Sequence, residues 1–407
     1  MNATQRIAVL KFGGTSVATG EQRAFAYSRV RDAREAGFAT VAVVSAMGRS
    51  PEPYATDTLL GLIGGRTGSP NADLLLAAGE LIAASVFADE LVAAGIDAVA
   101  LSGVQAGIVT DARHGDATIL RVEPAAIYAV LRRGAVAVVA GFHGATEAGV
   151  LTTLGRGGTD LSAIAIGHAL DAQRVDIYTD VSGAMTADPR RISAARTIDR
   201  ASLEEMTELA GHGAKVMHHK AADYASRTGT NYSIKGLRTD RGTLVDEGIR
   251  HHRPVTGVTA SGRLTWVRII RGDIESPRRR METELEMIRR VADAGISIDQ
   301  VTINQAGVAF VVDGDRGSEI RRLLLDLNLA VRIRESCSKL SVVGSGMRYA
   351  PGVVHRVVDA LSRADVEIIH CTDSNVTISV LVPEAEVTRA ETAVHEQFGL
   401  DREDPIA

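Results

Sequence analysis

Lys11-Phe-Gly-Gly-Thr-Ser16 and Gly155-Arg-Gly-Gly-Thr-Asp160 are the two stretches that decide the fold. Each follows an apolar, strand-like run, makes a glycine turn and ends in hydroxyl or acidic residues that can open a helix. The N–H groups at such a junction, with the positive end of the helix dipole, favour a phosphate or a carboxylate. We therefore expect two anion sites on one sheet, and a protein that binds two negatively charged substrates together.

The residues around these stretches alternate between strand-like and helix-like patterns. Continuous apolar strands separated by helices predict a mainly parallel sheet with helices on both faces. The expected strands cover 7–10, 40–44, 97–101, 135–140 and 175–178, and the expected helices cover 22–36, 72–94 and 161–170.

Polar and glycine residues follow the predicted strands at their carboxyl ends, where ligands bind in open α/β sheets. The same residue types also form ordinary turns, so their position alone leaves both interpretations open. The residues concerned are Lys11, Ser45, Ser102, Gly141 and Thr179-Asp180.

The pattern changes after about residue 246, and 251–254 reads as a linker. Two βαββ passages of similar length follow, which predicts two small α/β modules. The first has strands 264–270, 297–301 and 307–312 with helix 279–294; the second has strands 339–343, 367–370 and 376–382 with helix 353–364, before a last helix at 396–400. The expected domains are 1–248, 255–333 and 334–407.

Composition excludes several classes of protein. Of 407 residues, 45% are hydrophobic and 23% charged, and the net charge of −5 argues against a nucleic-acid binder. No apolar stretch is long enough for a membrane span, and no signal peptide is apparent. Cys337 and Cys371 are the only cysteines, which predicts two buried reduced thiols in a cytoplasmic protein without zinc or iron–sulfur sites.

Four residues of the two glycine stretches and their surroundings are candidates for chemistry. Lys11 is placed to contact a transferred phosphoryl group, although a surface lysine before a turn is an equal alternative. Arg156 between glycines fits a carboxylate, which a guanidinium can hold through two hydrogen bonds. Asp160 is either a helix cap or the partner of an ammonium group. Glu80 follows an apolar helical run and needs a cationic partner.

A third cluster lies within 178–190. Thr179 and Asp180 are candidates to meet a nucleoside and Arg190 its phosphates, whereas turn formation is the simpler alternative. Lys215 is either a phosphate contact or an ordinary helix lysine. The 11 histidines show no ligand or nucleophile spacing, and we assign them no chemistry.

Taken together, these phrases resemble the aspartokinase family, most closely the bacterial diaminopimelate-linked type. The resemblance covers nearly the whole chain, and the phrases occur in the family's order. They are the run 9–17, the strand end 43–48, the stretches 155–160, 179–190 and 213–218, and two C-terminal modules whose loop 344–352 resembles the effector-binding turn of an ACT domain.

The resemblance implies a three-layer amino-acid-kinase domain followed by two ACT modules. It also implies phosphorylation of the β-carboxylate of L-aspartate by ATP with Mg²⁺, for lysine, threonine and methionine biosynthesis. By similarity, the catalytic residues are Lys11, Arg156 and Asp160. The aspartate site would comprise Ser45, Thr56, Glu80, Arg156, Gly157, Gly158 and Thr159, and the nucleotide site Lys11, Phe12, Gly13, Gly14, Thr179, Asp180, Met185, Arg190 and Lys215.

The chain departs from the family pattern at several positions. Tyr232-Ser-Ile-Lys-Gly-Leu237 replaces an expected Arg-Ser-Ser/Thr phrase, Thr159 replaces a serine, and His219-Lys220 replaces Pro-Arg. In the first ACT module, Pro277 precedes three arginines instead of glycine. Ile303 replaces a glutamine, which predicts lysine or threonine binding weakened by about 1–3 kcal/mol.

Three further expectations complete the sequence analysis. Because ACT modules present sheet edges, we expect a homodimer or a higher homo-oligomer. One alternative is a related kinase for glutamate, acetylglutamate, carbamate or UMP. The other is a regulatory amino-acid-binding protein that has lost catalysis.

Overall fold

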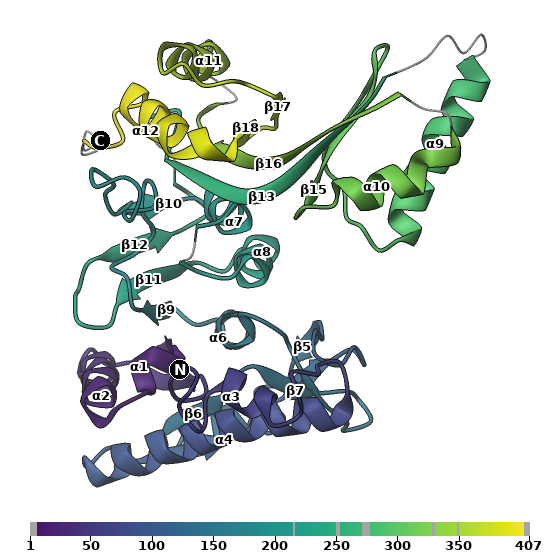
Figure 1. Ribbon diagram of the computed structural model, residues 1–407. Helices are drawn as coiled ribbons and strands as arrows, with labels where there is room; N and C mark the ends of the chain where they lie inside the picture. Colours follow the sequence, from purple (N-terminus) through teal and green to yellow (C-terminus); the bar gives the residue numbers. More distant parts are fainter. Residues whose placement is uncertain are drawn as a thin grey trace. The chain divides into compact units, whose positions relative to one another are not determined.

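The structure is a computed structural model that describes residues 6–214, 216–249, 253–270, 277–327, 330–347 and 350–402. Its contacts divide the chain into two units (Figure 1). Unit 1 is Met1–Met185 with Thr197–Arg250, and unit 2 is Thr186–Arg196 with His251–Ala407. Each unit is described by itself.

Unit 1 is built on an eight-stranded sheet. All neighbouring strands are parallel except β11 and β12, so the predicted mainly parallel sheet is confirmed. Its order is β10 (Arg200–Ala201), β12 (Gly242–Val245), β11 (Tyr232–Gly236), β9 (Arg174–Thr179), β1 (Ile7–Phe12), β2 (Ala39–Val44), β6 (Val136–Ala140) and β3 (Ala98–Leu101).

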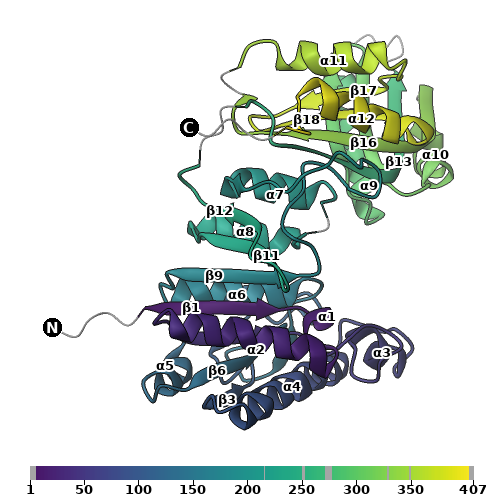
Figure 2. The same cartoon turned by 90° about the vertical axis from the view of Figure 1, so that its left-hand side faces the viewer.

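Helices cover both faces of this sheet, as predicted. Helices α2 (Gly20–Glu35) and α4 (Pro70–Ala93) pack with β1, β2 and β6 in one apolar cluster that includes Phe12 and Phe87. Helix α6 (Gly158–Ala169) contacts β1, β2 and β9 from the other side, and Figure 2 shows α2 and α6 on either side of β1. The remaining helices are α1 (Gly14–Val17), α3 (Thr56–Gly61), α5 (Ala125–Leu131), α7 (Leu203–Gly211) and α8 (His219–Thr228).

A second, four-stranded sheet in unit 1 was not predicted from the sequence. Its strands are only three or four residues long, too short for a clear alternation of apolar and polar residues. They are β5 (Ile119–Val122), β4 (Ile108–Thr110), β7 (His143–Ala145) and β8 (Leu151–Thr153), in that order. Strand β8 leads directly into the second glycine stretch.

Unit 2 contains one antiparallel six-stranded sheet. Its order is β14 (Asp299–Asn304), β15 (Gly307–Asp313), β13 (Gly257–Ile270), β16 (Ala330–Val343), β18 (Thr377–Pro383) and β17 (His370–Asp373). Its helices are α9 (Pro277–Asp293), α10 (Gly317–Leu324), α11 (Val353–Arg363) and α12 (Val387–Gln397).

Two apolar cores in unit 2 correspond to the two predicted modules. One joins α9 and α10 to β13 and β15 and contains Met287 and Phe310; the other joins α11 and α12 to β16 and β18 and contains Leu361 and Val394. Strand β13 belongs to both, because its first residues pair with the end of β16 and its last residues pair with β15.

Three sequence expectations differ from the structure of unit 2. The last helix is α12 at Val387–Gln397, so the expected helix at 396–400 is wrong. Helix α10 was not expected. Cys337 is buried but Cys371 is exposed, so the prediction of two buried thiols fails for Cys371. Among the residues that the structure describes, no helix is long and apolar enough to cross a membrane.

Candidate active site

The carboxyl ends of β1, β2 and β9 lie side by side, because these strands are neighbours in the parallel sheet. Lys11 is the last residue but one of β1, and its Nζ lies 2.6 Å from Oδ1 of Asp160 on α6. The two side chains are only 11% and 13% exposed. The structure thus brings the predicted site residues Lys11 and Asp160 together as an ion pair.

Gly13 and Gly14 follow β1, and Gly14 lies too close to neighbouring backbone for a side chain. A Cβ at position 14 would lie 2.7 Å from the carbonyl oxygen of Ala46, and one at position 13 would lie 3.2 Å from Nζ of Lys11. The N–H of Gly48 also donates to the carbonyl oxygen of Gly14. The turn thus brings bare backbone against Lys11, as an anion-binding junction requires.

Glu80 on α4 is a buried carboxyl group directed at the same place. Burial raises its pKa to about 8, while a hydrogen bond from the Ala46 N–H and the positive charge of Lys11 oppose this shift. Its Oε2 atom has no hydrogen-bond partner among the described residues. A buried oxygen without a partner is costly, so this geometry offers a place for a cationic ligand group.

The residue before Glu80 explains how α4 comes so close. A Cβ at Gly79 would lie 2.9 Å from the carbonyl oxygen of Tyr54 and 3.4 Å from Cβ of Ala46. Ser45 precedes Ala46 in the sequence and is half-buried. Thr56 is the first residue of α3 and lies two positions after Tyr54. The predicted aspartate residues Ser45, Thr56 and Glu80 are therefore carried by segments that meet at Gly79.

The loop before α6 presents Arg156 outward. Gly155 and Gly157 both have a left-handed backbone, with φ of 75° and 74°. A Cβ on Gly157 would lie 2.1 Å from Cβ of His218, so only glycine fits. Arg156 between them is exposed and forms no ion pair with another described residue. Its guanidinium is free to meet a ligand.

The first turn of α6 places the remaining predicted residues. The helix begins after Gly157 without a side-chain cap, so the alternative that Thr159 or Asp160 caps it is wrong. Gly158 and Thr159 are buried, and a Cβ on Gly141 would lie 2.5 Å from Cγ2 of Thr159. The Gly158 N–H donates to the carbonyl oxygen of Gly155 at 3.0 Å, and the first N–H of the regular helical series is that of Leu161, which donates to Gly157.

The predicted nucleotide residues are only partly brought together. Thr179 ends β9 beside β1, and its Oγ1 donates to Asp180 at 3.1 Å. Met185 forms an isolated bridge with Thr197. The side chain of Phe12 is fully buried between Phe87 and Tyr178, so only its backbone is available.

The two remaining predicted phosphate contacts are Arg190 and Lys215. Arg190 belongs to unit 2, where its guanidinium holds Asp188 at 2.6 and 2.9 Å. Lys215 lies outside the described residues. Their roles at the nucleotide stay predictions.

Asp73 is a positioning residue that the sequence analysis missed. Its buried carboxylate on α4 accepts hydrogen bonds from Nδ1 of His114 at 2.6 Å, the Gly115 N–H at 3.1 Å and Oγ1 of Thr153 at 2.5 Å. It therefore anchors β8, which leads into the Arg156 loop, to the helix that carries Glu80. An aspartate seven residues before Glu80 on the same helix face was the available signal.

Three more residues near the site were assigned no role from the sequence. Arg49 pairs with Asp180 at 3.2 Å. Oη of Tyr232 is buried without a partner among the described residues, and burial together with the charge of Asp160 raises its pKa. His218 precedes α8, and burial lowers its pKa while the positive charges of Lys220 and Arg156 act in the same direction.

The segment that departs from the family phrase has a visible structural role. Nζ of Lys235 on β11 lies 2.9 Å from Oδ1 of Asp176 on β9, and Arg174 reaches the other oxygen at 2.6 Å. Asp176 is almost fully buried. Lys235 thus supplies a positive charge that holds β11 against β9.

The chain matches two protein-family models and is similar to several known proteins. The model of the amino acid kinase family matches residues 6–236, and an ACT domain model matches residues 340–398. Aspartokinase 1 of Bacillus subtilis is 39% identical over 406 residues, which cover 98% of this chain and 100% of that protein. An aspartokinase of Mycolicibacterium smegmatis is 34% identical, with 98% of this chain and 97% of that protein covered.

Solved structures agree with the sequence comparison. Aspartokinase III of E. coli in complex with aspartate and ADP is 26% identical with a TM-score of 0.77, and covers 97% of this chain and 100% of that one. Aspartate kinase of Clostridium acetobutylicum has a TM-score of 0.79 at 20% identity, with 96% and 100% covered, which speaks for the fold alone.

Proposed function

This chain belongs to the amino acid kinase family and, within it, to the aspartokinases, and on that premise we propose that it transfers the γ-phosphoryl group of ATP to the β-carboxylate of L-aspartate. The product would be 4-phospho-L-aspartate. The observation that carries the proposal is the buried Lys11–Asp160 ion pair beside the unpartnered carboxyl oxygen of Glu80. A positive and a negative group thus lie together where a zwitterionic acid and a polyphosphate would meet.

The aspartate end of the site has a group for each charge of the amino acid. Glu80 and Asp160 would receive the ammonium group, which would satisfy the Oε2 atom that lacks a partner. Arg156, exposed and free of ion pairs among the described residues, would hold the α-carboxylate through two hydrogen bonds. Ser45, Thr56 and the backbone of Gly157, Gly158 and Thr159 would complete the pocket.

The phosphoryl transfer itself needs no general base. A side-chain carboxyl group with a pKa near 4 is already ionised at neutral pH and can attack directly. What the protein must supply is alignment and positive charge on the phosphoryl oxygens. Lys11 would supply the charge, and Gly13 and Gly14 would let the backbone N–H groups approach the phosphates.

The nucleotide would be held at the end of β9 by Thr179, Asp180 and Met185, with Arg190 and Lys215 at its phosphates. The described residues contain no group of three metal-ligating side chains. The residues present fit a Mg²⁺ ion whose ligands are mainly nucleotide phosphate oxygens and water, as is usual for this ion. Asp160 would be the nearby protein carboxylate. The ion would neutralise phosphate charge.

A coupled ADP-release assay tests the proposal. We expect release that depends on ATP, Mg²⁺ and L-aspartate together, with glutamate, acetylglutamate, carbamate and UMP giving less than a few per cent of that rate. Detection of an acyl phosphate by hydroxylamine would identify the product class. A protein that releases ADP faster with glutamate than with aspartate, or not at all, would contradict it.

Regulation is proposed to be weaker than is usual for the family. Ile303 on β14 is 55% exposed and offers no polar group to a lysine or threonine effector. The arginines after Pro277 replace the glycine at which an effector would contact bare backbone. One solved relative, E. coli aspartokinase III, was crystallised with lysine and aspartate in a T-state. Here we propose that lysine and threonine inhibit only at millimolar concentrations.

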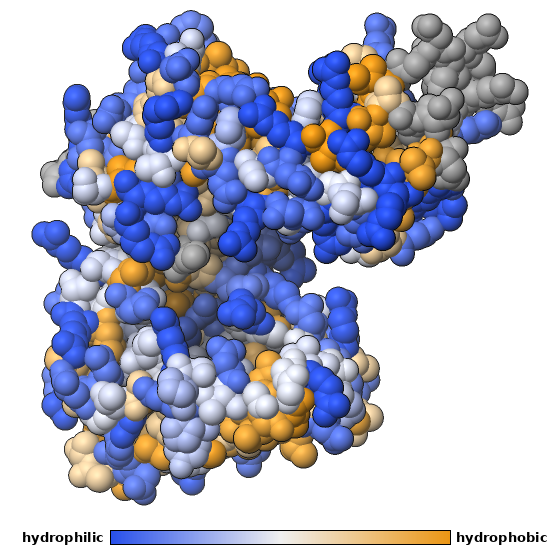
Figure 3. Space-filling view, in the orientation of Figure 1, coloured by the Kyte–Doolittle hydropathy of each residue, from blue (hydrophilic) through white to orange (hydrophobic). Residues whose placement is uncertain are grey.

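Assembly is proposed to be homodimeric through the edge strand β14, which exposes the apolar side chains of Val301 and Ile303. Figure 3 shows further apolar side chains (orange) where α4 lies, and Leu74 on α4 is 63% exposed. That surface would allow a higher homo-oligomer. Light scattering after chromatography should give at least twice the mass of one chain, 43.0 kDa.

We also propose the cellular location, the pathways and the domain bounds of this enzyme. The enzyme would act in the cytoplasm in lysine, threonine and methionine biosynthesis, including the diaminopimelate route. Its domains would be the kinase domain at 1–248 and the ACT modules at 255–333 and 334–407.

A further inference from the structure

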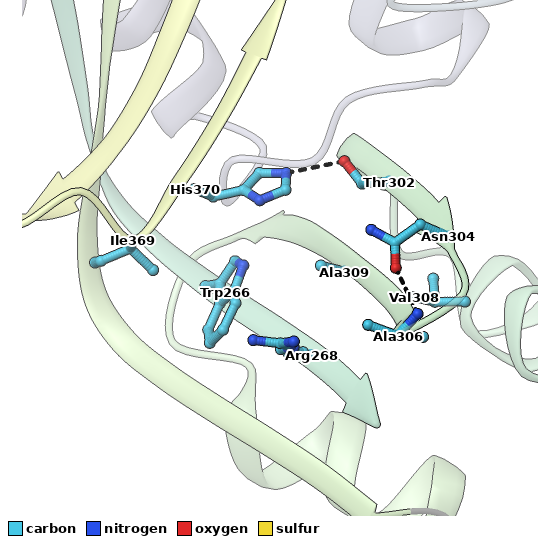
Figure 4. Close-up of a pocket in the computed structure, with 10 residues that line it drawn as sticks. Trp266, Arg268, Thr302, Asn304, Ala306, Val308, Ala309, Ile369 and His370 are labelled. Atoms are coloured by element: carbon cyan, nitrogen blue, oxygen red, sulfur yellow. Dashed lines mark hydrogen bonds between the residues drawn. The ribbon is translucent and has the colours of Figure 1, made fainter. Parts of the chain in front are cut away.

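A pocket of about 210 Å³ opens on the sheet of unit 2 (Figure 4). That volume would hold about seven water molecules, or one metabolite of amino-acid size. Both modules contribute to it. Strands β13, β14 and β15 of the first module provide most of the lining, and Ile369 and His370 come from the second.

Among the residues that the structure describes, the lining of the pocket carries a positive charge and no negative one. Its lining includes Arg268 but neither aspartate nor glutamate. Arg268 on β13 is paired in register with Arg332 on β16, so the two arginine side chains leave the sheet on the same face. Neither forms an ion pair with another described residue. Like charges directly opposite each other are unfavourable, and an anion between or beside them would relieve the repulsion.

Hydrogen-bond donors surround Arg268. Nε1 of Trp266 is buried and has no partner among the described residues, which leaves an N–H group unsatisfied. The amide of Asn304 uses its oxygen to accept from the Ala306 N–H at 2.9 Å, so its NH₂ group remains to donate. Figure 4 shows Trp266 and Arg268 side by side on β13, with Asn304 on β14, which is separated from β13 by β15.

A polar contact between the modules borders the pocket. Nε2 of His370 lies 3.2 Å from Oγ1 of Thr302 and 3.2 Å from the carbonyl oxygen of Gln300. A ligand beside this contact would touch both modules at once. Ile303, where a family effector would be expected, alternates with Thr302 and Asn304 and therefore points to the other side of β14.

We propose that this pocket binds a small oxyanion, a carboxylate or a phosphate, through Arg268, the Nε1–H of Trp266 and the NH₂ group of Asn304. None of the described aspartate or nucleotide residues lines this pocket. The bound anion would join the two modules through residues on β13, β14 and the start of β17.

The chain offers a direct probe, because Trp266 is its only tryptophan. The full-length protein would be titrated with succinate and, separately, with inorganic phosphate, while tryptophan emission is recorded on excitation at about 295 nm. We expect a saturable change with at least one of them. The anion that gives the change shows whether the pocket binds a carboxylate or a phosphate. The absence of a saturable change with both anions would overturn the proposal.

Three variants locate the response. Arg268→Gln should weaken binding at least about tenfold, since a charge-assisted hydrogen bond is lost. Arg321→Gln, an equal charge change on the exposed surface of α10, should bind as the wild type does. Arg156→Gln should also retain the response, which separates this pocket from the proposed aspartate site. Loss of the response in Arg156→Gln, or its retention in Arg268→Gln, would refute the assignment.

Thermal unfolding gives a second readout that does not depend on fluorescence. Without ligand, Arg268→Gln should unfold at the same or a higher temperature than the wild type, because the repulsion from Arg332 is removed. The anion should raise the melting temperature of the wild type and of Arg321→Gln but not that of Arg268→Gln. Equal ligand-induced shifts in all three proteins would count against the site.

Discussion

Nζ of Lys11 lies 2.6 Å from Oδ1 of Asp160, and this ion pair ties the end of β1 to the first turn of α6. Because both side chains are nearly buried, neither charge is well solvated. Removing one partner would leave the other charge buried and unpaired. The pair therefore holds the lysine in place before a phosphate arrives.

Lys11→Ala should lower kcat in the ADP-release assay by two to four orders of magnitude, equivalent to about 3–5 kcal/mol of transition-state stabilisation. The physical reason is loss of the positive charge at the transferred phosphoryl group. The KM for ATP should change much less than kcat. Turnover within tenfold of the wild type would contradict the role of Lys11.

Asp160→Asn tests the role of Asp160 apart from that of Lys11. It keeps the size of the side chain but removes the charge, so we expect a rise in KM for aspartate of about tenfold or more if the ammonium group is held there. The double variant with Lys11→Ala should cost less than the sum of the single changes, since the residues are in contact. Additive effects would show that the two act independently.

Glu80 should make folding stability depend on pH. Its pKa is raised from 4.5 to about 8, so the folded protein keeps a proton that the unfolded chain loses. Stability contributed by this group is present below pH 4.5 and is lost as pH rises toward 8, by at most about 1.4 kcal/mol per pH unit. Urea unfolding of Glu80→Gln should lack this slope between pH 5 and 8; equal slopes in both proteins would refute it.

Gly157→Ala should be more damaging than a glycine replacement that meets no neighbour. Its Cβ would strike His218, whereas Gly37 has a similar φ of 83° with nothing within 4 Å. We expect Gly37→Ala to cost about 1 kcal/mol and Gly157→Ala at least twice that, together with a higher KM for aspartate. Unfolding curves and initial rates would measure both, and equal costs would argue against close packing of the Arg156 loop.

Lys235→Met tests the segment that departs from the family phrase. Removing its charge from the buried Asp176 should destabilise unit 1 by about 1–3 kcal/mol, because among the described residues Arg174 is then the one cation still paired with Asp176. The exposed pair Arg227–Asp223 on α8 provides the control, since Arg227→Met should cost under about 0.5 kcal/mol. Comparable losses in chemical denaturation would show that Lys235 is dispensable.

Inhibition assays test the proposed weak regulation. Lysine, threonine and both together should inhibit ADP release only at millimolar levels, and Ile303→Gln should lower the inhibitory concentration by restoring a polar side chain on β14. The control is Val301→Gln on the same edge, which should leave inhibition unchanged. Strong inhibition of the unaltered enzyme below one millimolar would defeat the hypothesis.

Much of unit 1 could be predicted from the sequence, because its long strands are apolar throughout and its helices carry clear periodicity. Lys11, Ser45 and Thr179 follow strands in the sequence, and the parallel arrangement alone then brings them to one edge. The pairing of Lys11 with Asp160 could not be predicted, since it depends on how closely α6 packs against β1.

Other features depend on contacts between distant residues that leave no local pattern. Asp73 and Lys235 look like ordinary surface charges in the sequence, but their partners lie 80 and 59 positions away, at Thr153 and Asp176. Within unit 2, the strand and helix patterns predict two consecutive modules. The sequence offered no sign that β13 extends back to Gly257 and serves both.

That shared strand has a consequence for anyone who wishes to isolate the regulatory part. A fragment that begins near residue 334 would contain α11 and α12 but would lack Gly257–Ser261, the strand segment that pairs with the end of β16. The edge of β16 left without this partner would favour aggregation. Neither half can be excised cleanly, and a disturbance in one should reach the other along a single continuous backbone.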